Sequence, residues 1–302
     1  MPHSCSVFWC WLIACAVSAC LTACTPAQEP FARLTGLILD TDLPEISGMA
    51  ASGVHANALW VLNDGGKDPV LYAVSRRGRR LARFLLEGVN NTDWESLAAF
   101  ELDGKHYLLI ADTGDNGGLR RTLQLHVVEE PTALTNATLR PAWSIAFRWP
   151  DGARDCEAVV VDADAGQILL LPKKRPPAEL FALPLRPGPE RQIARQLGTL
   201  TGITQLKEDE QRSNPRRARR RGLVTGAELS PDARTLAVLT YERLMLYRRA
   251  PGEPWASAVA RTPEVHSLPL LPQAEALAWS HDGRGLFVTS EFQPAPLYWL
   301  VP

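Results

Sequence analysis

Four carboxylates flank one short stretch of the sequence. Asp93 and Glu95 open it, and Asp112 and Asp115 close it within the run ADTGDN. The residues between them form two largely apolar blocks separated by the turn sequence DGK, which predicts two strands joined by a hairpin. In an antiparallel pair the start of one strand lies beside the end of the other, so we expect the four carboxylates to gather at one edge. Clustered carboxylates bind hard cations or act as general acids and bases.

The same grouping of strands recurs five times along the chain. Each group opens with a serine, threonine or glutamate, at Ser47, Glu95, Glu157, Thr225 and Glu275. A second apolar strand follows in each group, such as ALWVLND or QILLLPKK, and then a third, such as PVLYAVS or APLYWLV. Short strands in repeated groups, with almost no helical periodicity, predict an all-β fold, a five-bladed β-propeller. A six-bladed ring with one divergent blade is the alternative.

The spacing of the groups sets the number of blades. The leading residues lie 48 to 68 positions apart, and one four-stranded blade needs roughly 40–50 residues, so no interval holds two blades. Blades are therefore expected to start near residues 45, 93, 155, 224 and 273. The last group has only three strands before Pro302. The N-terminal segment FARLTGLIL (31–39) is expected to supply its fourth strand and to close the ring, which removes an exposed sheet edge.

The leading residues of the inner strands are expected to form a ring at one mouth of the channel. The predicted metal ligands are Ser47, Glu95, Glu157, Thr225 and Glu275. Two positions earlier, on the same side of each strand, lie Glu45, Asp93 and Asp155. Three glutamates at ~6 Å and an effective dielectric of ~20 repel by roughly 3 kcal/mol per pair, so they must retain protons or bind a cation. Oxygen ligands without Cys or His favour Ca²⁺. A wet, metal-free ring of solvated acids is the alternative.

The ends of the second strands are expected to surround the same mouth. Asp64, Asp112 and Asp115 are candidates to activate a water molecule. Lys173 and Lys174 are candidates to hold an anionic substrate, and a salt bridge from them to Asp155 or Asp112 is the alternative. The arginine-rich run RSNPRRARRRG (212–222) precedes the inner strand of the fourth blade. It is expected to overhang this mouth, either binding anionic groups or forming a solvated insertion.

The rest of the composition excludes several kinds of site. No nucleophile elbow, HExxH, P-loop or dinucleotide fingerprint occurs in the sequence. Five of the six cysteines lie in the first 24 residues, which leaves Cys156 alone and predicts neither a disulfide nor a cysteine-based metal site. Cys156 is expected to be buried and inert. The net charge of −1 gives no argument for a nucleic-acid partner, and none is expected.

The N-terminal segment is expected to be an export signal. The run VFWCWLIACAVSACLTAC (7–24) is apolar, too short to span a bilayer comfortably, and ends in small residues. Its last four residues, LTAC, resemble a bacterial lipoprotein signal. The resemblance implies that residues 1–24 are a signal peptide, that Cys24 is lipidated, and that 25–302 form a single propeller domain in the cell envelope. Thr25 after the cysteine implies the outer membrane, facing the periplasm. A plain secretory signal or a short membrane anchor is the alternative.

Several segments resemble known propeller families. LWVLND, DWES, ADTGDN, RDCEA and VTGAELS resemble a group of bacterial exported propellers of unassigned activity, grouped with esterase-like phytase and SdiA-regulated propellers. The order Ser, Glu, Glu, hydroxyl, Glu of the leading residues is similar to that of calcium-activated nucleotidases of the apyrase type. These are five-bladed propellers with a central Ca²⁺.

The resemblance implies the fold and a calcium site, and it leaves two hypotheses for the function. One is a metal-dependent hydrolase of a phosphate or other ester that acts on a small anionic substrate. The other is a non-catalytic envelope propeller that binds a protein or glycan and holds a structural ion.

Overall fold

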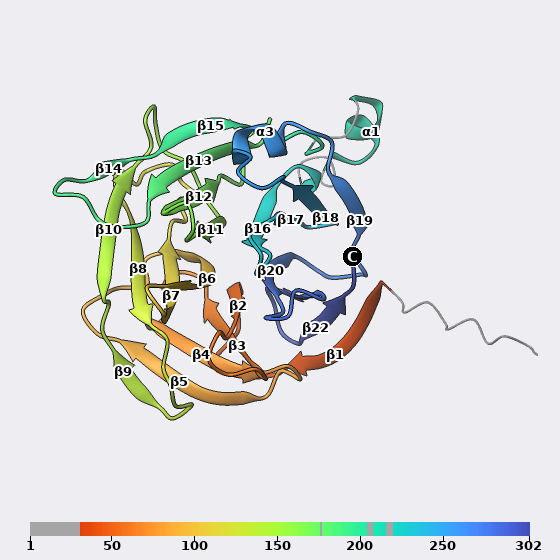
Figure 1. Ribbon diagram of the computed structural model, residues 1–302. Coiled ribbons are helices and arrows are strands. Elements are labelled where there is room, and N and C mark those ends of the chain that lie inside the picture. Colours follow the sequence, from red (N-terminus) through yellow and green to blue (C-terminus); the bar gives the residue numbers. More distant parts are fainter. Residues whose placement is uncertain (1–30, 176, 204–207, 216–219) are drawn as a thin grey trace, which may run out of the picture.

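Five β-sheets lie around a central axis (Figure 1). The computed structural model describes residues 31–175, 177–203, 208–215 and 220–302. The innermost strand of each sheet lines the channel, and the next strands follow it outward in antiparallel pairs, with a parallel strand added at the outer edge of two sheets. This arrangement confirms the predicted all-β, five-bladed β-propeller. The predicted signal segment, including Cys24, lies outside the described residues.

The first two blades contain five strands each, in order from the channel outward. Blade one is made of β2 (Ile46–Ala51), β3 (Ala58–Asn63), β4 (Val70–Ser75), β5 (Arg80–Leu86) and β9 (Ala137–Leu139). Blade two is made of β6 (Trp94–Leu102), β7 (Lys105–Asp112), β8 (Leu123–Glu129), β10 (Trp143–Arg148) and β14 (Gln192–Ile193).

The other three blades contain four strands each. Blade three is made of β11 (Ala158–Asp162), β12 (Gln167–Leu171), β13 (Glu179–Pro184) and β15 (Arg195–Thr199). Blade four is made of β16 (Val224–Leu229), β17 (Thr235–Thr240), β18 (Arg243–Arg248) and β19 (Glu264–Ser267). Blade five is made of β20 (Ala274–Trp279), β21 (Leu286–Ser290), β22 (Ala295–Leu300) and β1 (Ala32–Ile38). The short helices α1 (Glu208–Ser213) and α3 (Trp255–Val259) lie outside the sheets.

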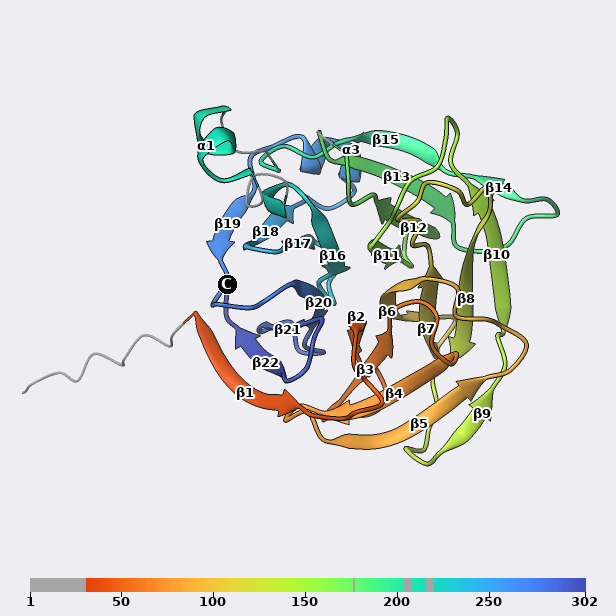
Figure 2. The ribbon, with the colours of Figure 1, turned by 180° about the vertical axis from the view of Figure 1, so that it is seen from behind.

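The N-terminal strand closes the ring, as predicted. β1 pairs antiparallel with β22, from Ala32 opposite Leu300 to Ile38 opposite Ala295, and it lies at the periphery of blade five (Figure 2). Thr35 donates a side-chain hydrogen bond to the carbonyl of Leu297 (2.9 Å). The first and last strands of the fold are thereby joined, and the outer edge of β22 is covered.

The fifth strands of blades one and two come from later parts of the chain. β9 follows β8 in sequence but pairs in parallel with β5 of blade one. β14 follows β13 of blade three but pairs in parallel with β10 of blade two. Each added strand therefore covers the outer edge of the preceding blade and ties neighbouring blades together.

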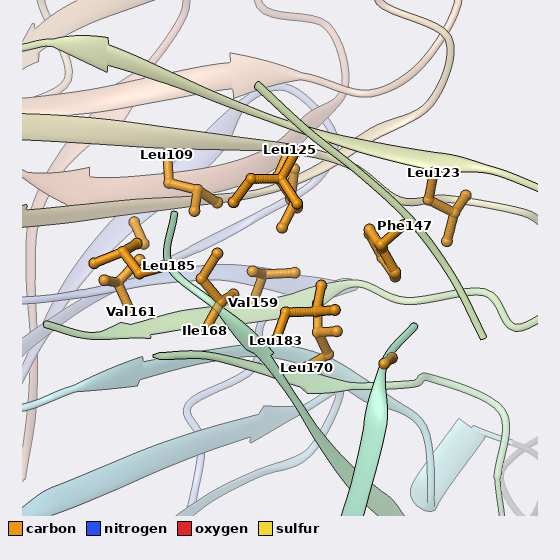
Figure 3. Packing of buried hydrophobic residues seen from close by; sticks show 14 of the residues in the cluster. Leu109, Leu123, Leu125, Phe147, Val159, Val161, Ile168, Leu170, Leu183 and Leu185 are labelled. Atoms are coloured by element: carbon orange, nitrogen blue, oxygen red, sulfur yellow. The ribbon is translucent and has the colours of Figure 1, made fainter. Parts of the chain in front are cut away.

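The hydrophobic core lies between the faces of adjacent blades. Between blades two and three, Leu109 and Leu125 lie opposite Val159, Ile168 and Leu170, all fully or almost fully buried (Figure 3). Cys156 belongs to the same cluster and is fully buried, and burial raises the pKa of its thiol. The blades are thus held by packed apolar layers, which leaves the polar ends of the inner strands to the channel.

Candidate metal centre at the channel mouth

The inner strands begin with an irregularity that directs one side chain out of the regular ladder. In blades one, two, four and five, where the inner strand pairs with the second strand of its blade, one residue of the inner strand has no partner in that pairing. These unpaired residues are Ser47, Glu95, Thr225 and Glu275. Glu157 lies immediately before β11. A bulge at a strand end redirects the side chain of the extra residue. All five predicted ring residues are buried at these strand starts, around the channel mouth that we call the acidic mouth.

The two hydroxyl residues of the ring join neighbouring blades. Ser47 donates to the carbonyl of Trp94 (2.6 Å) in blade two, and Thr225 donates to the carbonyl of Ala274 (2.7 Å) in blade five. The glycine after each hydroxyl allows this approach: a Cβ on Gly48 would lie 2.9 Å from the nitrogen of Leu97. The Ser-Gly and Thr-Gly pairs of the repeats therefore link the inner strands of neighbouring blades.

Five carboxylates gather at one side of the mouth, and we call them the acidic centre: Asp64, Asp93, Glu95, Asp155 and Glu157. They form two triads that share Glu95. Oxygens of Asp64, Asp93 and Glu95 lie within 4.8 Å of one another, as do oxygens of Glu95, Asp155 and Glu157. The second triad is buried, whereas Asp64 and Asp93 are partly exposed. The acidic centre thus has a buried inner part and a side open to solvent.

Two glycines leave room for these carboxylates. A Cβ on Gly114 would lie 2.4 Å from Oδ2 of Asp93 and 2.5 Å from Oε1 of Glu95. A Cβ on Gly65 would lie 2.7 Å from Oδ1 of Asp93. Any larger residue at either position would push the carboxylates apart, so the TGD and NDGG turns form a cradle around the first triad.

The acidic centre holds more carboxylates than its surroundings neutralise. Burial, followed by the charge of Glu157, raises the pKa of Glu95 well above its usual range. Burial and neighbouring acids also raise the pKa of Glu157. Burial and the nearby Asp64 raise the pKa of Asp93 to about 7. Oε2 of Glu157 is buried without a hydrogen-bond partner among the described residues, which is the environment expected of a metal-ligand oxygen.

Lys173 fills the other side of the mouth. Its ammonium forms an ion pair with Glu157 and lies 3.7 Å from Glu275, and it lies 5.5 Å from the ring centroid of Tyr241. The Tyr241 hydroxyl donates to Oε1 of Glu275 (2.8 Å). Although burial lowers it, the pKa of Lys173 is raised overall because Glu157 and the other acids favour its charged form. A protein cation therefore lies between Glu157 and Glu275.

Lys174 also pairs with an acid. Its ammonium lies 2.8 Å from Oδ2 of Asp155 and donates to Oδ1 of Asn116 (2.6 Å). Its side chain is 45% exposed, so it keeps a face toward solvent. A pocket of about 260 Å³ opens beside it and is lined by Asp155, Arg175 and the Asn116–Gly118 turn. Lys174 therefore forms the alternative that the sequence left open, a salt bridge to Asp155, and it also lines an accessible pocket.

Asp112 and Asp115, the two remaining predicted catalytic acids, bind groups of the loop after β7. Asp112 accepts a hydrogen bond from the backbone nitrogen of Asp93 (3.1 Å) and pairs with the guanidinium of Arg120 (2.7 Å). Asp115 accepts backbone hydrogen bonds from Leu119 (2.7 Å) and Arg120 (3.0 Å). Both acids are buried. They position the loop that carries Gly114 rather than joining the two triads.

The arginine-rich run reaches the mouth at its C-terminal end. The guanidinium of Arg220 lies over the ring of Tyr241, 4.4 Å from its centroid. Residues 216–219 lie outside the described part of the chain. Arg220 therefore adds positive charge near Tyr241, whose hydroxyl donates to Glu275.

Sequence patterns predict some residues of this site and do not predict others. The repeated Asp-x-Glu spacing in DWE and DCE signals that Asp93 and Asp155 share a side with Glu95 and Glu157. Tyr241 was not among the predicted site residues, and its only signal is its place directly after β17. The donor set of carboxylate oxygens suits Ca²⁺, and the buried Glu95, Asp155 and Glu157 are the residues that would hold it, with Asp64 and Asp93 beside them.

Comparison with protein-family models and with curated proteins finds no match for this chain. Within the described residues, no helix is both long and apolar enough to cross a membrane. The functional conclusion therefore depends on the geometry of the acidic mouth.

Proposed function

We propose that the acidic centre binds Ca²⁺ and that the chain is a calcium-dependent hydrolase of a phosphoester or a related anionic ester. The observation that carries the proposal is the buried Oε2 of Glu157, which has no hydrogen-bond partner among the described residues and belongs to a triad of buried carboxylates. Such a group is costly to leave unpaired. A divalent cation would neutralise the acids and satisfy their oxygens together.

The residues of the acidic centre divide into two roles. Glu95, Asp155 and Glu157 are buried and would hold the ion, with Asp64 and Asp93 toward solvent. A bound Ca²⁺ supplies Lewis-acid polarisation of an ester oxygen and neutralises charge on the substrate. The partly exposed side is where substrate and water have access.

The proposed base is the Asp64–Asp93 pair. The two carboxyls share a hydrogen bond, and the pKa of Asp93 is raised by burial and by Asp64 to about 7. A carboxyl with a pKa near neutral accepts and returns a proton at physiological pH. Lys174 and Arg175 line the adjoining pocket and would bind the negative charge of the substrate. Asp112 and Asp115 act indirectly, by positioning the loop between these groups.

A non-catalytic envelope propeller with a structural ion is the second candidate. This candidate is favoured by the ion pairs of both lysines, which were the predicted substrate-binding groups: Lys173 pairs with Glu157 and Lys174 with Asp155. In this case the outer surface would bind a protein or glycan of the envelope, and the ion would only join blades one to three.

Turnover of a substrate panel separates the two candidates. The panel contains nucleotides, phytate and simple esters, with and without calcium. The hydrolase proposal predicts calcium-dependent turnover that D64N abolishes while calcium binding remains. E157Q should abolish turnover and also weaken calcium binding at least about tenfold. The control E45Q changes a partly exposed glutamate that pairs with Lys67 at the same mouth, and it should keep full activity. If calcium raises the melting temperature but no compound is cleaved, the structural-ion candidate stands.

We propose further that the protein is an outer-membrane lipoprotein facing the periplasm, anchored through Cys24. The support is the apolar run at 7–24 and its LTAC ending. C24S should prevent incorporation of labelled palmitate and move the protein from the membrane to the soluble fraction. Retention of C24S in the membrane fraction would instead indicate an uncleaved anchor.

A further inference from the structure

A groove lined by arginines lies on the side of the propeller away from the acidic mouth. It has a volume of about 840 Å³ and is lined by Arg33, Leu34, Arg76, Arg77, Arg284 and Trp299, among others; we call it the basic groove. Arg76 and Arg77 belong to the turn between β4 and β5, and Arg284 to the turn between β20 and β21. These turns lie at the ends of the strands opposite to those that form the acidic mouth.

Backbone contacts fix the position of the groove. β1 of blade five packs directly on the β4–β5 turn of blade one, because a Cβ on Gly36 would lie 2.3 Å from the carbonyl oxygen of Arg77. A Cβ on Gly78 would lie 2.2 Å from the carbonyl oxygen of Leu37. The strand that closes the ring thus brings Arg33 beside the arginines of another blade.

The arginines of this region are poorly neutralised. No described carboxylate forms an ion pair with Arg33, Arg76, Arg77 or Arg79, although Arg284 pairs with Asp282 (2.8 Å). The Arg76 guanidinium lies over the ring of Phe287, 5.5 Å from its centroid. Its Nε is buried without a hydrogen-bond partner among the described residues. Guanidinium groups held this way match the oxygens of a phosphate group.

One exposed leucine, Leu34, lines the groove, and two more follow it along the chain. Leu34, Leu37 and Leu39 are 52%, 44% and 62% exposed, on and just after β1. Apolar side chains next to unpaired cations are typical of a surface that rests on a bilayer interface. Position along the chain points the same way: Arg33 is nine residues from Cys24, so it lies at most about 30 Å from a lipid attached there.

We propose that the basic groove docks the propeller on an anionic bilayer, with Arg33, Arg76 and Arg77 binding lipid phosphate groups. The inference rests on the lipid anchor proposed above and is independent of the calcium site. Docking through this groove turns the acidic mouth away from the membrane, so that substrate reaches it from the aqueous side.

Vesicle binding tests the groove without the anchor. All described strands lie between residues 32 and 300, so a chain starting at residue 25 retains the whole ring. It is sedimented with phosphatidylcholine vesicles that contain or lack phosphatidylglycerol, at low and high salt. We expect binding only to the anionic vesicles, and loss of binding at high salt. The variant R33Q/R76Q/R77Q should bind about 100-fold more weakly, since each cation near the surface contributes roughly tenfold or less.

A matched control variant distinguishes binding through the basic groove from an effect of the protein's net charge. R83Q/R121Q/R195Q removes three exposed arginines from blades one, two and three and should bind like the wild type. Equal losses in the two triple variants would overturn the proposal, as would equal binding to neutral and anionic vesicles. Binding of inorganic phosphate in the groove without vesicle binding would overturn the lipid as its source. Calcium binding by the same variants reports the acidic centre separately, so a failure of one proposal is not mistaken for a failure of the other.

Discussion

The two carboxylate oxygens of Glu157 lie in different environments. Oε1 pairs with Lys173, and Oε2 is buried without a partner among the described residues. Lys173 also faces Glu275, so one protein cation serves two glutamates of the ring. The proposed ion would therefore lie on the Oε2 side of Glu157, toward Glu95 and Asp155, because Lys173 occupies the Oε1 side.

Removal of Lys173 should make the fold dependent on calcium. In K173M, Glu157 and Glu275 lose their cation, and breaking a buried pair of this kind costs about 3 kcal/mol. We expect the loss in urea unfolding with EDTA and a smaller loss with calcium present. K174M removes a cation whose side chain is 45% exposed and should cost at most about 1 kcal/mol. Equal losses in the two variants would show that Lys173 has no special role.

The cradle around the first triad depends on Gly114. In G114A the new methyl group meets the carboxylates of Asp93 and Glu95 at 2.4–2.5 Å. We expect calcium affinity to fall by about 10- to 100-fold, the usual cost of disturbing groups that orient metal ligands. G117A in the same loop meets only the side chain of Leu119 at 3.4 Å and should keep its affinity. Titration calorimetry on both proteins compares them, and equal affinities would show that the cradle does not position the ligands.

At the scale of elements, ring closure depends on how closely β1 approaches blade one. Gly36 has no room for a side chain because the backbone of Arg77 lies in the way. G36A should therefore lower the free energy of unfolding by about 1–3 kcal/mol, the range for overpacking. G198A in β15, where a Cβ would meet nothing within 4 Å, is the matched control. A G36A protein as stable as G198A would mean that β1 shifts freely and does not fix the ring.

Much of the element order follows from local sequence patterns. The five strand groups, their turns and the closing role of β1 were predictable, because each depends on alternation, turn residues or the shortage of strands in the last group. β9 and β14 were not, since segments of three and two residues carry no detectable period. Their pairing is set by the outer edges that they meet in the folded ring.

The site was predictable only in outline. Asp-x-Glu spacing places two acids on one side of a strand, which anticipates Asp93 with Glu95 and Asp155 with Glu157. The hydrogen bonds of Ser47 and Thr225 to the next blade depend on the distance between blades, which no local pattern encodes. The inward direction of the Lys173 side chain could not be predicted from local sequence either, because it depends on the acids that surround it in the folded channel.

For the whole molecule, the acids at the mouth predict how stability depends on pH. The pKa of Asp93 rises from 3.8 to about 7, chiefly through burial and Asp64. Glu291 directly follows β21 and interacts with Glu275 of the ring, and its pKa rises from 4.5 to about 7, chiefly through burial and Glu275. Between these values the folded state binds more protons than the unfolded state, so stability falls as pH rises. In EDTA, the melting temperature should therefore decrease from about pH 4 to about pH 7.

Calcium should reverse this dependence, because the ion replaces the protons that the acids release. With saturating calcium, the melting temperature should hold or rise over the same interval, and D93N should reduce the slope seen in EDTA. Parallel pH profiles with and without calcium would show that the ion does not bind where these acids titrate.

The most direct test of the calcium site is a calorimetric titration of calcium into the wild type, E157Q and E228Q. Glu228 is the control because it is a buried glutamate of an inner strand that lies away from the acidic mouth. Its carboxyl accepts a hydrogen bond from the backbone N–H of Trp279, and burial raises its pKa well above the usual range. We predict that the wild type and E228Q bind calcium with dissociation constants at or below about 10⁻³ M, and that E157Q binds at least about tenfold more weakly. No binding by the wild type, or equal binding by E157Q and E228Q, would contradict a calcium ion held by the acidic centre.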